Sequence, residues 1–386
     1  MRNPLSKKVV EIKPSGIRKF FDIVSEMKDA ISLGVGEPDF DTPWHIREEG
    51  IYSLERGRTF YTSNAGLAEL KEEITKYLKR RCQLEYQPSE VIVTIGGSEA
   101  IDIGLRAMLD PGDEVLIPQP SYVSYLPCVT LADGVPVIIE LKAENEFRLT
   151  KQELLDAVTD KTKVLIMPFP NNPTGSIMTK EDLEAIAEVV IEKDLFVISD
   201  EIYSELTYGQ DHVSIASLPG MKERTIVING FSKSYAMTGW RLGYAAGPKE
   251  IITQMIKIHQ FAIMCAPTTS QYAAVEALRN GDGDVATMRE AYDQRRRYLV
   301  TRLNEMGLPC FEPLGAFYVF PCIKDLGMTS DEFATTLLQE EKVAVVPGTA
   351  FGDCGEGFLR ISYAYSIENL KVALDRIENF VKRHKK

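Results

Sequence analysis

A single lysine, Lys233, lies among small and hydroxyl-bearing residues in the stretch NGFSKSYAMTGWRLGY, residues 229–244. It follows TIVI (225–228), a short apolar run that predicts a buried strand. Burial and nearby cations lower the pKa of a lysine, and its neutral amine can then form a Schiff base with a carbonyl group. Arg241, eight positions later, could bind a phosphate through its guanidinium fork. The stretch is therefore a candidate for carbonyl chemistry.

Three further polar groups also follow predicted strands. Gly97 and Ser98 lie between a strand and a helix, where free backbone N–H groups and the helix dipole can hold a phosphate. Asn172, in the turn-forming PNNPTG, offers an amide donor, and Asp200 ends the apolar run that precedes Tyr203. A buried carboxylate is costly unless it is paired, and a protonated ring nitrogen is one such partner. Taken singly, each group also has a structural explanation: a glycine turn, a loop or a helix-capping aspartate.

The combination is more specific than its parts. In open α/β sheets, ligands bind beyond the carboxyl ends of the strands, so these groups are expected to meet. Pyridoxal phosphate needs an amine for its aldehyde, a carboxylate for its ring nitrogen, donors for its phenolate oxygen and a cationic nest for its phosphate. The sequence therefore predicts pyridoxal 5'-phosphate as the cofactor.

Short apolar runs alternate with amphipathic helical stretches through the middle of the chain. The runs that predict strands are 90–97, 113–118, 135–141, 162–170, 195–201 and 224–229. Helices are expected over 99–110 and 179–193, the second with Thr179 as N-cap. This alternation indicates an α/β fold whose largely parallel sheet is covered on both faces. GDGD, residues 281–284, predicts a break before a charged helix over 285–307 and a smaller α+β part.

The chain resembles the class I pyridoxal-phosphate-dependent aminotransferases of fold type I over essentially its whole length, with archaeal and bacterial aromatic aminotransferases the nearest likeness. The motifs that carry this resemblance are GVGEPDFDTP (34–43), YTSNAGLAEL (61–70), GGSEAI (96–101), PSYVSY (120–125), NNPTG (171–175), SDEIY (199–203), FSKSYAMTGWRLGY (231–244), GAFYVFP (315–321), VAVVPGTAFG (343–352) and LRISYA (359–364). The resemblance implies a large domain over 46–284, with a mostly parallel seven-stranded sheet between helices. A smaller α+β domain would combine 1–45 with 285–386.

The resemblance also assigns roles to individual residues. It implies that Lys233 holds the cofactor and later moves the proton, that Asp200 pairs with the ring nitrogen, and that Tyr203 contacts the phenolate oxygen. Further cofactor contacts are implied for Gly97, Ser98, Tyr122, Asn172, Ser232, Arg241 and, from the partner subunit of a homodimer with shared sites, Tyr61. Substrate contacts are implied for Ile17, Gly36, Tyr122, Asn172 and Arg360, which would take the α-carboxylate. Gly230 replaces a serine found in some relatives, which puts cofactor affinity in question.

Net charge and composition limit the kinds of partner and the cellular location that we expect. The net charge of -12 argues against nucleic acid or an anionic membrane as the main partner. No stretch approaches the roughly 20 apolar residues that span a bilayer. Six cysteines without a CxxC pair favour reduced thiols and a cytoplasmic protein. Four scattered histidines without HExxH give no reason to expect a bound metal.

Several functions remain open at this point. The expected reaction moves an amino group between an L-amino acid and a 2-oxo acid such as 2-oxoglutarate. An aromatic donor is favoured, because the window 259–271 contains no arginine for a second carboxylate and Ser98 stands where another subgroup has lysine. The alternatives are an aspartate or other dicarboxylate-specific aminotransferase, a carbon–sulfur β-lyase or racemase-like enzyme using the same cofactor, and a cofactor-sensing regulator. The regulator would need a DNA-binding segment ahead of residue 11.

Overall fold

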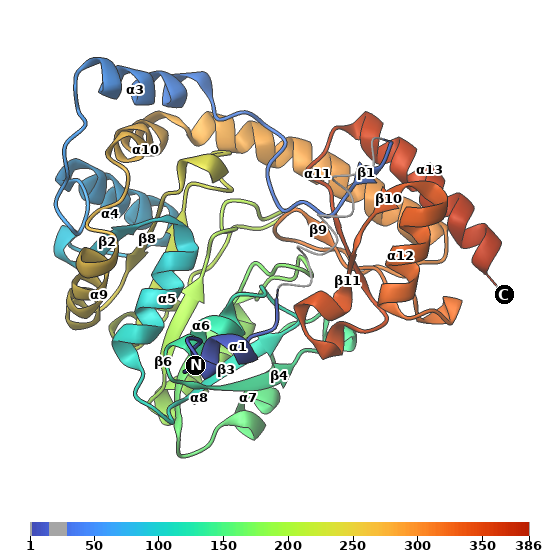
Figure 1. Cartoon of the computed structure of the whole chain (residues 1–386), viewed down its shortest axis with the longest axis horizontal. Helices are drawn as coiled ribbons and strands as arrows, with labels where there is room; N and C mark the ends of the chain where they lie inside the picture. The colour runs from blue at the N-terminus through green and yellow to red at the C-terminus, as the bar shows by residue number, and fades with distance from the viewer. Residues whose placement is uncertain (1, 15–28, 386) are drawn as a thin grey trace.

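A seven-stranded sheet lies at the centre of the larger part of the molecule (Figure 1). The computed structural model describes residues 2–14 and 29–385. The strand order is β2–β8–β7–β6–β5–β3–β4, with β8 antiparallel to both neighbours and every other pair parallel. The strands are β2 (Val91–Thr94), β3 (Glu114–Gln119), β4 (Val135–Glu140), β5 (Thr162–Met167), β6 (Phe196–Asp200), β7 (Thr225–Gly230) and β8 (Gly243–Ala246). The mainly parallel sheet predicted from the sequence is therefore confirmed.

Successive side chains of each strand point to opposite faces of the sheet, and helices cover the apolar side chains on both faces. The helices around the sheet are α3 (Trp44–Glu55), α4 (Ala68–Cys82), α5 (Gly96–Met108), α6 (Tyr125–Leu131), α7 (Lys151–Ala157), α8 (Lys180–Glu192), α9 (Lys249–Ala262) and α10 (Thr268–Asn280). On β5, Val164 and Ile166 join a core with residues of α5, α6 and α9, whereas Leu165 and Met167 join a core with residues of α7 and α8. Thr179 caps α8 through its side chain, as predicted.

The seventh strand, β8, begins at the end of the lysine motif and is not among the predicted runs. Its sequence, GYAA, lacks the β-branched residues that mark a strand. It needs small residues because the start of α5 lies against it. A Cβ added to Gly243 would lie 2.6 Å from the carbonyl carbon of Gly96 and 2.7 Å from the nitrogen of Gly97.

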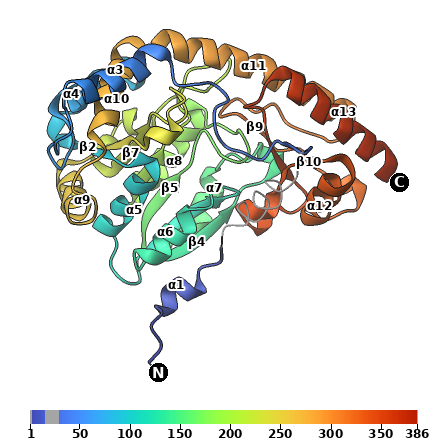
Figure 2. The ribbon, with the colours of Figure 1, turned by 45° about the horizontal axis from the view of Figure 1, so that its top comes forward.

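The C-terminal part of the chain forms a second group of elements. Strands β11 (Val346–Pro347), β12 (Leu359–Ser362) and β9 (Tyr318–Val319) make an antiparallel sheet, and β1 (Ile31–Ser32) pairs with β10 (Val343–Ala344). Figure 2 shows α12 (Ser330–Glu341) and α13 (Ile367–His384) beside these strands, with α11 (Asp282–Glu305) running toward them from α10. The short helix α1 (Lys7–Glu11) lies near the N-terminus.

The break predicted at 281–284 is present but shorter than expected. Gly281 alone separates α10 from α11, and the rest of GDGD forms the first turn of α11. Asp282 and Asp284 stabilise that turn because carboxylates interact favourably with the positive end of a helix. Within residues 2–14 and 29–385, every helix is too short or too polar to cross a membrane.

Candidate active site

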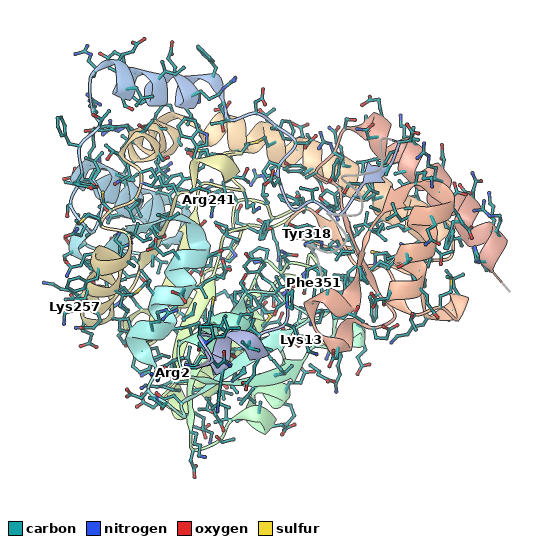
Figure 3. All side chains as sticks on the ribbon, viewed as in Figure 1. Arg2, Lys13, Arg241, Lys257, Tyr318 and Phe351 are labelled. Atoms are coloured by element: carbon teal, nitrogen blue, oxygen red, sulfur yellow. The ribbon has the colours of Figure 1, made fainter. Side chains whose placement is uncertain are left out.

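A cavity of about 680 Å³ opens where the carboxyl ends of the parallel strands face the C-terminal sheet. Of the predicted site residues that the structure describes, all except Tyr61 line it, namely Gly36, Gly97, Ser98, Tyr122, Asn172, Asp200, Tyr203, Ser232, Lys233, Arg241 and Arg360. Arg241 and Tyr318, both labelled in Figure 3, lie near the middle of the molecule and line the cavity from two sides. The loops that follow separate strands therefore meet in one place, as the sheet topology requires.

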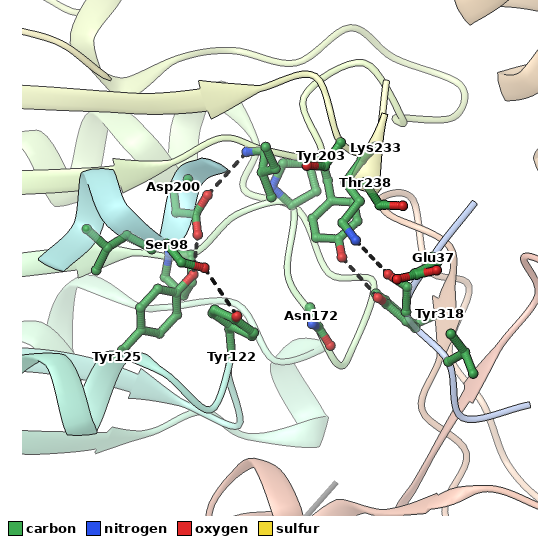
Figure 4. Close-up of a pocket in the computed structure, with 18 of the residues that line it drawn as sticks. Glu37, Ser98, Tyr122, Tyr125, Asn172, Asp200, Tyr203, Lys233, Thr238 and Tyr318 are labelled. Carbon is green, nitrogen blue, oxygen red and sulfur yellow. Dashed lines mark hydrogen bonds between the residues drawn. The ribbon is translucent and has the colours of Figure 1, made fainter. Parts of the chain in front are cut away.

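Lys233 lies in the turn that follows β7, and its amine points into the cavity (Figure 4). Its Nζ donates a hydrogen bond of 2.5 Å to the carbonyl oxygen of Gly36. Burial lowers the pKa of Lys233 to about 8; Glu37 opposes this change and Arg360 reinforces it. A fraction of the amine is therefore neutral near neutral pH, which is the form that attacks a carbonyl carbon or accepts a proton.

Asp200 ends β6 and is only 7% exposed. Tyr125 Oη donates a hydrogen bond of 2.7 Å to Asp200 Oδ2, and the backbone N–H of Ile202 donates one of 3.3 Å to Oδ1 (Figure 4). Burial raises the pKa of Asp200, while the Tyr125 hydrogen bond opposes that shift. Turns rather than a helix follow Asp200, so this carboxylate does not cap a helix.

An anion-binding cradle lies at the N-terminus of α5. The helix begins at Gly96, three residues before the predicted start, so Gly97 and Ser98 belong to its first turn with unpaired backbone N–H groups. Arg241 covers this end, since a Cβ added to Gly96 would lie 2.7 Å from its Nη2. The guanidinium and the helix dipole both favour a phosphate here. Ser98 Oγ also lies 3.4 Å from Tyr122 Oη.

Arg360 occupies the opposite side of the cavity, on β12, and is buried. Its Nη1 donates a hydrogen bond of 2.9 Å to Asn172 Oδ1, and its Nη2 donates to the carbonyl oxygen of Gly34. The rings of Tyr318 and Phe351 flank the guanidinium, with their centroids 4.6 and 4.8 Å from its Cζ. Arg360 Nε is buried without a hydrogen-bond partner, so the site retains a donor for an anionic ligand.

Tyr125, Tyr318, Glu37 and Thr238 line the cavity but were not predicted as site residues. The Oη atoms of Tyr318 and Tyr203 lie 2.9 Å apart. Tyr125 and Tyr318 both fall within motifs of the family resemblance, PSYVSY and GAFYVFP. Their place in these motifs is the sequence feature that could have marked them as site residues. Their through-space partners could not be deduced from position in the sequence.

Comparison with known proteins identifies the family. The model of aminotransferase class I and II matches residues 28–377. The chain is 52% identical to the aspartate aminotransferase of Pyrococcus abyssi and 48% identical to the aromatic-amino-acid aminotransferase 2 of Thermococcus litoralis, over 99% of each chain in both cases. The chain belongs to the class I and II aminotransferases. A crystal structure of the aromatic aminotransferase from Pyrococcus horikoshii is 50% identical and superposes with a TM-score of 0.91, covering 96% of this chain and 99% of that one.

The residues of this aminotransferase fit pyridoxal phosphate, the cofactor of the family. The cradle formed by the start of α5 and Arg241 suits a phosphate, because it combines free N–H groups with a guanidinium. Lys233 supplies an amine of lowered pKa, and Asp200 supplies a buried carboxylate that a cationic ring nitrogen would neutralise. Lys233 and Asp200 could hold the two ends of the cofactor's ring system.

Two predicted site residues of the aminotransferase are not among the described residues that line the cavity. Tyr61 is 79% exposed, in the segment between α3 and α4, and is not in the lining of this chain's cavity. Its contact with the phosphate at a partner's site stays a prediction. Ile17 lies outside the described residues, so its predicted substrate contact stays a prediction.

Proposed function

We propose that this aminotransferase moves the amino group of an aromatic L-amino acid to a 2-oxo acid such as 2-oxoglutarate. The charge of the cavity is the observation that carries the proposal. Among the described lining residues, the cations are Lys233, Arg241 and Arg360. With these assigned to the cofactor aldehyde, the phosphate and the α-carboxylate, no cation among the described lining residues is left to pair with an acidic side chain of the donor.

The rest of the lining favours an aromatic side chain. Four tyrosines contribute ring surface to the cavity: Tyr122, Tyr125, Tyr203 and Tyr318. Aromatic rings pack edge-to-face or offset, and Tyr122 and Tyr125 already form an edge-to-face pair with centroids 5.6 Å apart. An aspartate donor is the second candidate, because the Pyrococcus abyssi relative carries that name.

When bound, the cofactor supplies the electron sink that makes the Cα–H bond of the donor acidic. Lys233 Nζ removes that Cα proton and later gives a proton back, which completes the transfer of the amino group. Asp200, which accepts a hydrogen bond from Tyr125, would pair with the ring nitrogen and keep it protonated. Tyr203 would donate to the phenolate oxygen, and Tyr122 would lie against the ring.

In this proposal one arginine holds the α-carboxylate of the substrate, and another holds the phosphate of the cofactor. Arg360 binds the α-carboxylate bidentately and is aimed by its hydrogen bond to Asn172. Arg241, Gly97, Ser98 and Ser232 hold the phosphate. Gly36 contributes its backbone to the substrate side.

The proposal also includes a homodimer and the predicted domain division. Strands β2 to β8 fall within 46–284, and β9 to β12 follow residue 285, which supports the division. The pairing of β1 with β10 supports the grouping of residues 1–45 with the C-terminal part. In the dimer, Tyr61 would reach the phosphate at the partner's site.

A panel of amino donors with 2-oxoglutarate tests the proposed substrate class. We expect the highest kcat/KM with phenylalanine, tyrosine or tryptophan. A clear preference for aspartate would instead establish the second candidate. Release of ammonia and pyruvate from cystathionine without an oxo-acid acceptor would favour the β-lyase.

A further inference from the structure

Tyr318 connects the two sides of the cavity. It lies on β9, next to the strand that carries Arg360, with Tyr318 opposite Ser362 in the antiparallel pair. Its partner Tyr203 follows β6 of the large sheet. The two hydroxyl oxygens lie 2.9 Å apart, and Figure 4 shows this hydrogen bond beside Lys233. One hydrogen bond thus joins the C-terminal sheet to the carboxyl end of the large sheet.

The direction of this hydrogen bond matters because each hydroxyl has a single proton. Burial raises the pKa of Tyr318 and raises that of Tyr203 well above its usual value, so both hydroxyls stay protonated at neutral pH. If Tyr203 donates to Tyr318, it has no proton left for a second acceptor. Tyr203 can donate to a ligand only when Tyr318 is the donor in the pair.

The remaining contacts of Tyr318 hold its hydroxyl in place. A Cβ added to Gly36 would lie only 2.6 Å from Tyr318 Oη, so the backbone at Gly36 bounds the hydroxyl on one side. The Arg360 guanidinium lies over the ring, 4.6 Å from its centroid. The rings of Tyr203 and Tyr318 also pack edge-to-face, with centroids 5.9 Å apart. The hydroxyl therefore has little freedom to turn away from Tyr203.

We propose that Tyr318 is a positioning residue whose hydroxyl donates to Tyr203 Oη and directs the Tyr203 proton to the phenolate oxygen of the cofactor. The inference rests on the proposed function, which places Tyr203 against that oxygen. A donor that itself accepts a hydrogen bond becomes a stronger donor, so Tyr318 increases the stabilisation that Tyr203 gives to the deprotonated oxygen.

The visible absorbance of the lysine-bound cofactor gives a readout that does not depend on turnover. The pH at which it titrates reports how firmly a proton is held between the linkage nitrogen and the phenolate oxygen. Weaker donation from Tyr203 leaves that proton bound to higher pH. Tyr318→Phe, which keeps the ring and its contact with Arg360, should therefore raise the titration midpoint by about half to one pH unit.

A double-mutant cycle of Tyr203→Phe and Tyr318→Phe tests the coupling in the dimeric holoenzyme. We expect each single variant to raise the midpoint, Tyr203→Phe more than Tyr318→Phe. In the Tyr203→Phe background, Tyr318→Phe should have no further effect. Tyr292→Phe, which removes another buried hydroxyl of the same core but lies outside the cavity lining, is the matched control and should leave the midpoint unchanged.

The other outcomes separate this inference from the proposed function. A shift with Tyr203→Phe but none with Tyr318→Phe would overturn the inference and leave the role of Tyr203 intact. Equal shifts of Tyr318→Phe in both backgrounds would also overturn it, because Tyr318 would then act without Tyr203. No shift with Tyr203→Phe would refute the proposed role of Tyr203, and the inference would fail with it.

Discussion

We expect the amine of Lys233 to control how fast the cofactor-free protein captures pyridoxal phosphate. Burial lowers the pKa of Lys233 to about 8, and only the unprotonated amine attacks the aldehyde. The capture rate should therefore rise with pH below 8 and level off above it. Stopped-flow absorbance with added pyridoxal phosphate measures this rate. Lys233→Ala should form no covalent product and show no transamination; a capture rate that keeps rising toward pH 10 would mean that the lysine is not perturbed.

Substitution of Arg360 tests how the donor's α-carboxylate is bound. Lysine cannot reproduce the bidentate fork, so Arg360→Lys should lower kcat/KM by about tenfold to a hundredfold. Every donor carries an α-carboxylate, so the factor should be similar for phenylalanine, tyrosine and glutamate, with the cofactor still bound. Arg302→Lys, a substitution in an ion pair with Asp375 outside the cavity lining, is the control. A loss confined to glutamate would assign Arg360 to a side-chain carboxylate.

At the scale of elements, the contact between β8 and the start of α5 sets the shape of the phosphate cradle. Gly243→Ala would place a methyl group within 2.7 Å of the Gly97 nitrogen, so the helix start must shift. We expect weaker cofactor binding and a free energy of unfolding lower by about 1–3 kcal/mol. Equilibrium dialysis and chemical denaturation measure the two effects.

Gly283→Ala is the matched control for that substitution. Gly283 lies in the first turn of α11, and an added Cβ would meet nothing within 4 Å. Cofactor binding should be unchanged in this variant, and stability should be equal or slightly higher because alanine favours a helix. Normal cofactor affinity in Gly243→Ala would show that the cradle tolerates displacement of the helix start.

At the scale of the whole molecule, one exposed apolar surface supports the proposed dimer. Phe60, Tyr61 and Phe261 are 80%, 79% and 87% exposed. Asn64 Nδ2 donates a 2.8 Å hydrogen bond to the carbonyl oxygen of Met264, which brings the segment after Tyr61 next to the segment after Phe261. Exposed large apolar side chains that gather on one surface mark protein interfaces. We expect a dimer in sedimentation at working concentrations.

Mixed dimers test whether the sites are shared. Lys233→Ala subunits lack the amine, and Tyr61→Ala subunits should bind the cofactor weakly. A hybrid of the two contains one site with a native Lys233 and a native Tyr61, so mixing should restore tight cofactor binding and activity to about half of its sites. Mixing with no gain over the Tyr61→Ala dimer would show that each chain builds its site alone.

The sequence alone determined the fold class and most of the candidate site, because both depend on local patterns. Apolar runs of strand length alternating with helical stretches require a mainly parallel sheet with both faces covered, and its strands bring their carboxyl ends to one edge. Lys233, Asp200, Asn172 and Gly97 each follow such a strand. Their meeting in one cavity was therefore predictable before any coordinates.

Only the tertiary structure decided which side chains contact one another. Tyr203 and Tyr318 are separated by 115 positions, and Tyr125 and Asp200 by 75, so neither hydrogen bond has a local signal. The lowered pKa of Lys233 likewise depends on how completely the packed chain excludes water around it. Periodicity reports the face on which a residue lies, whereas the direction and partner of a buried polar group follow from how distant segments pack.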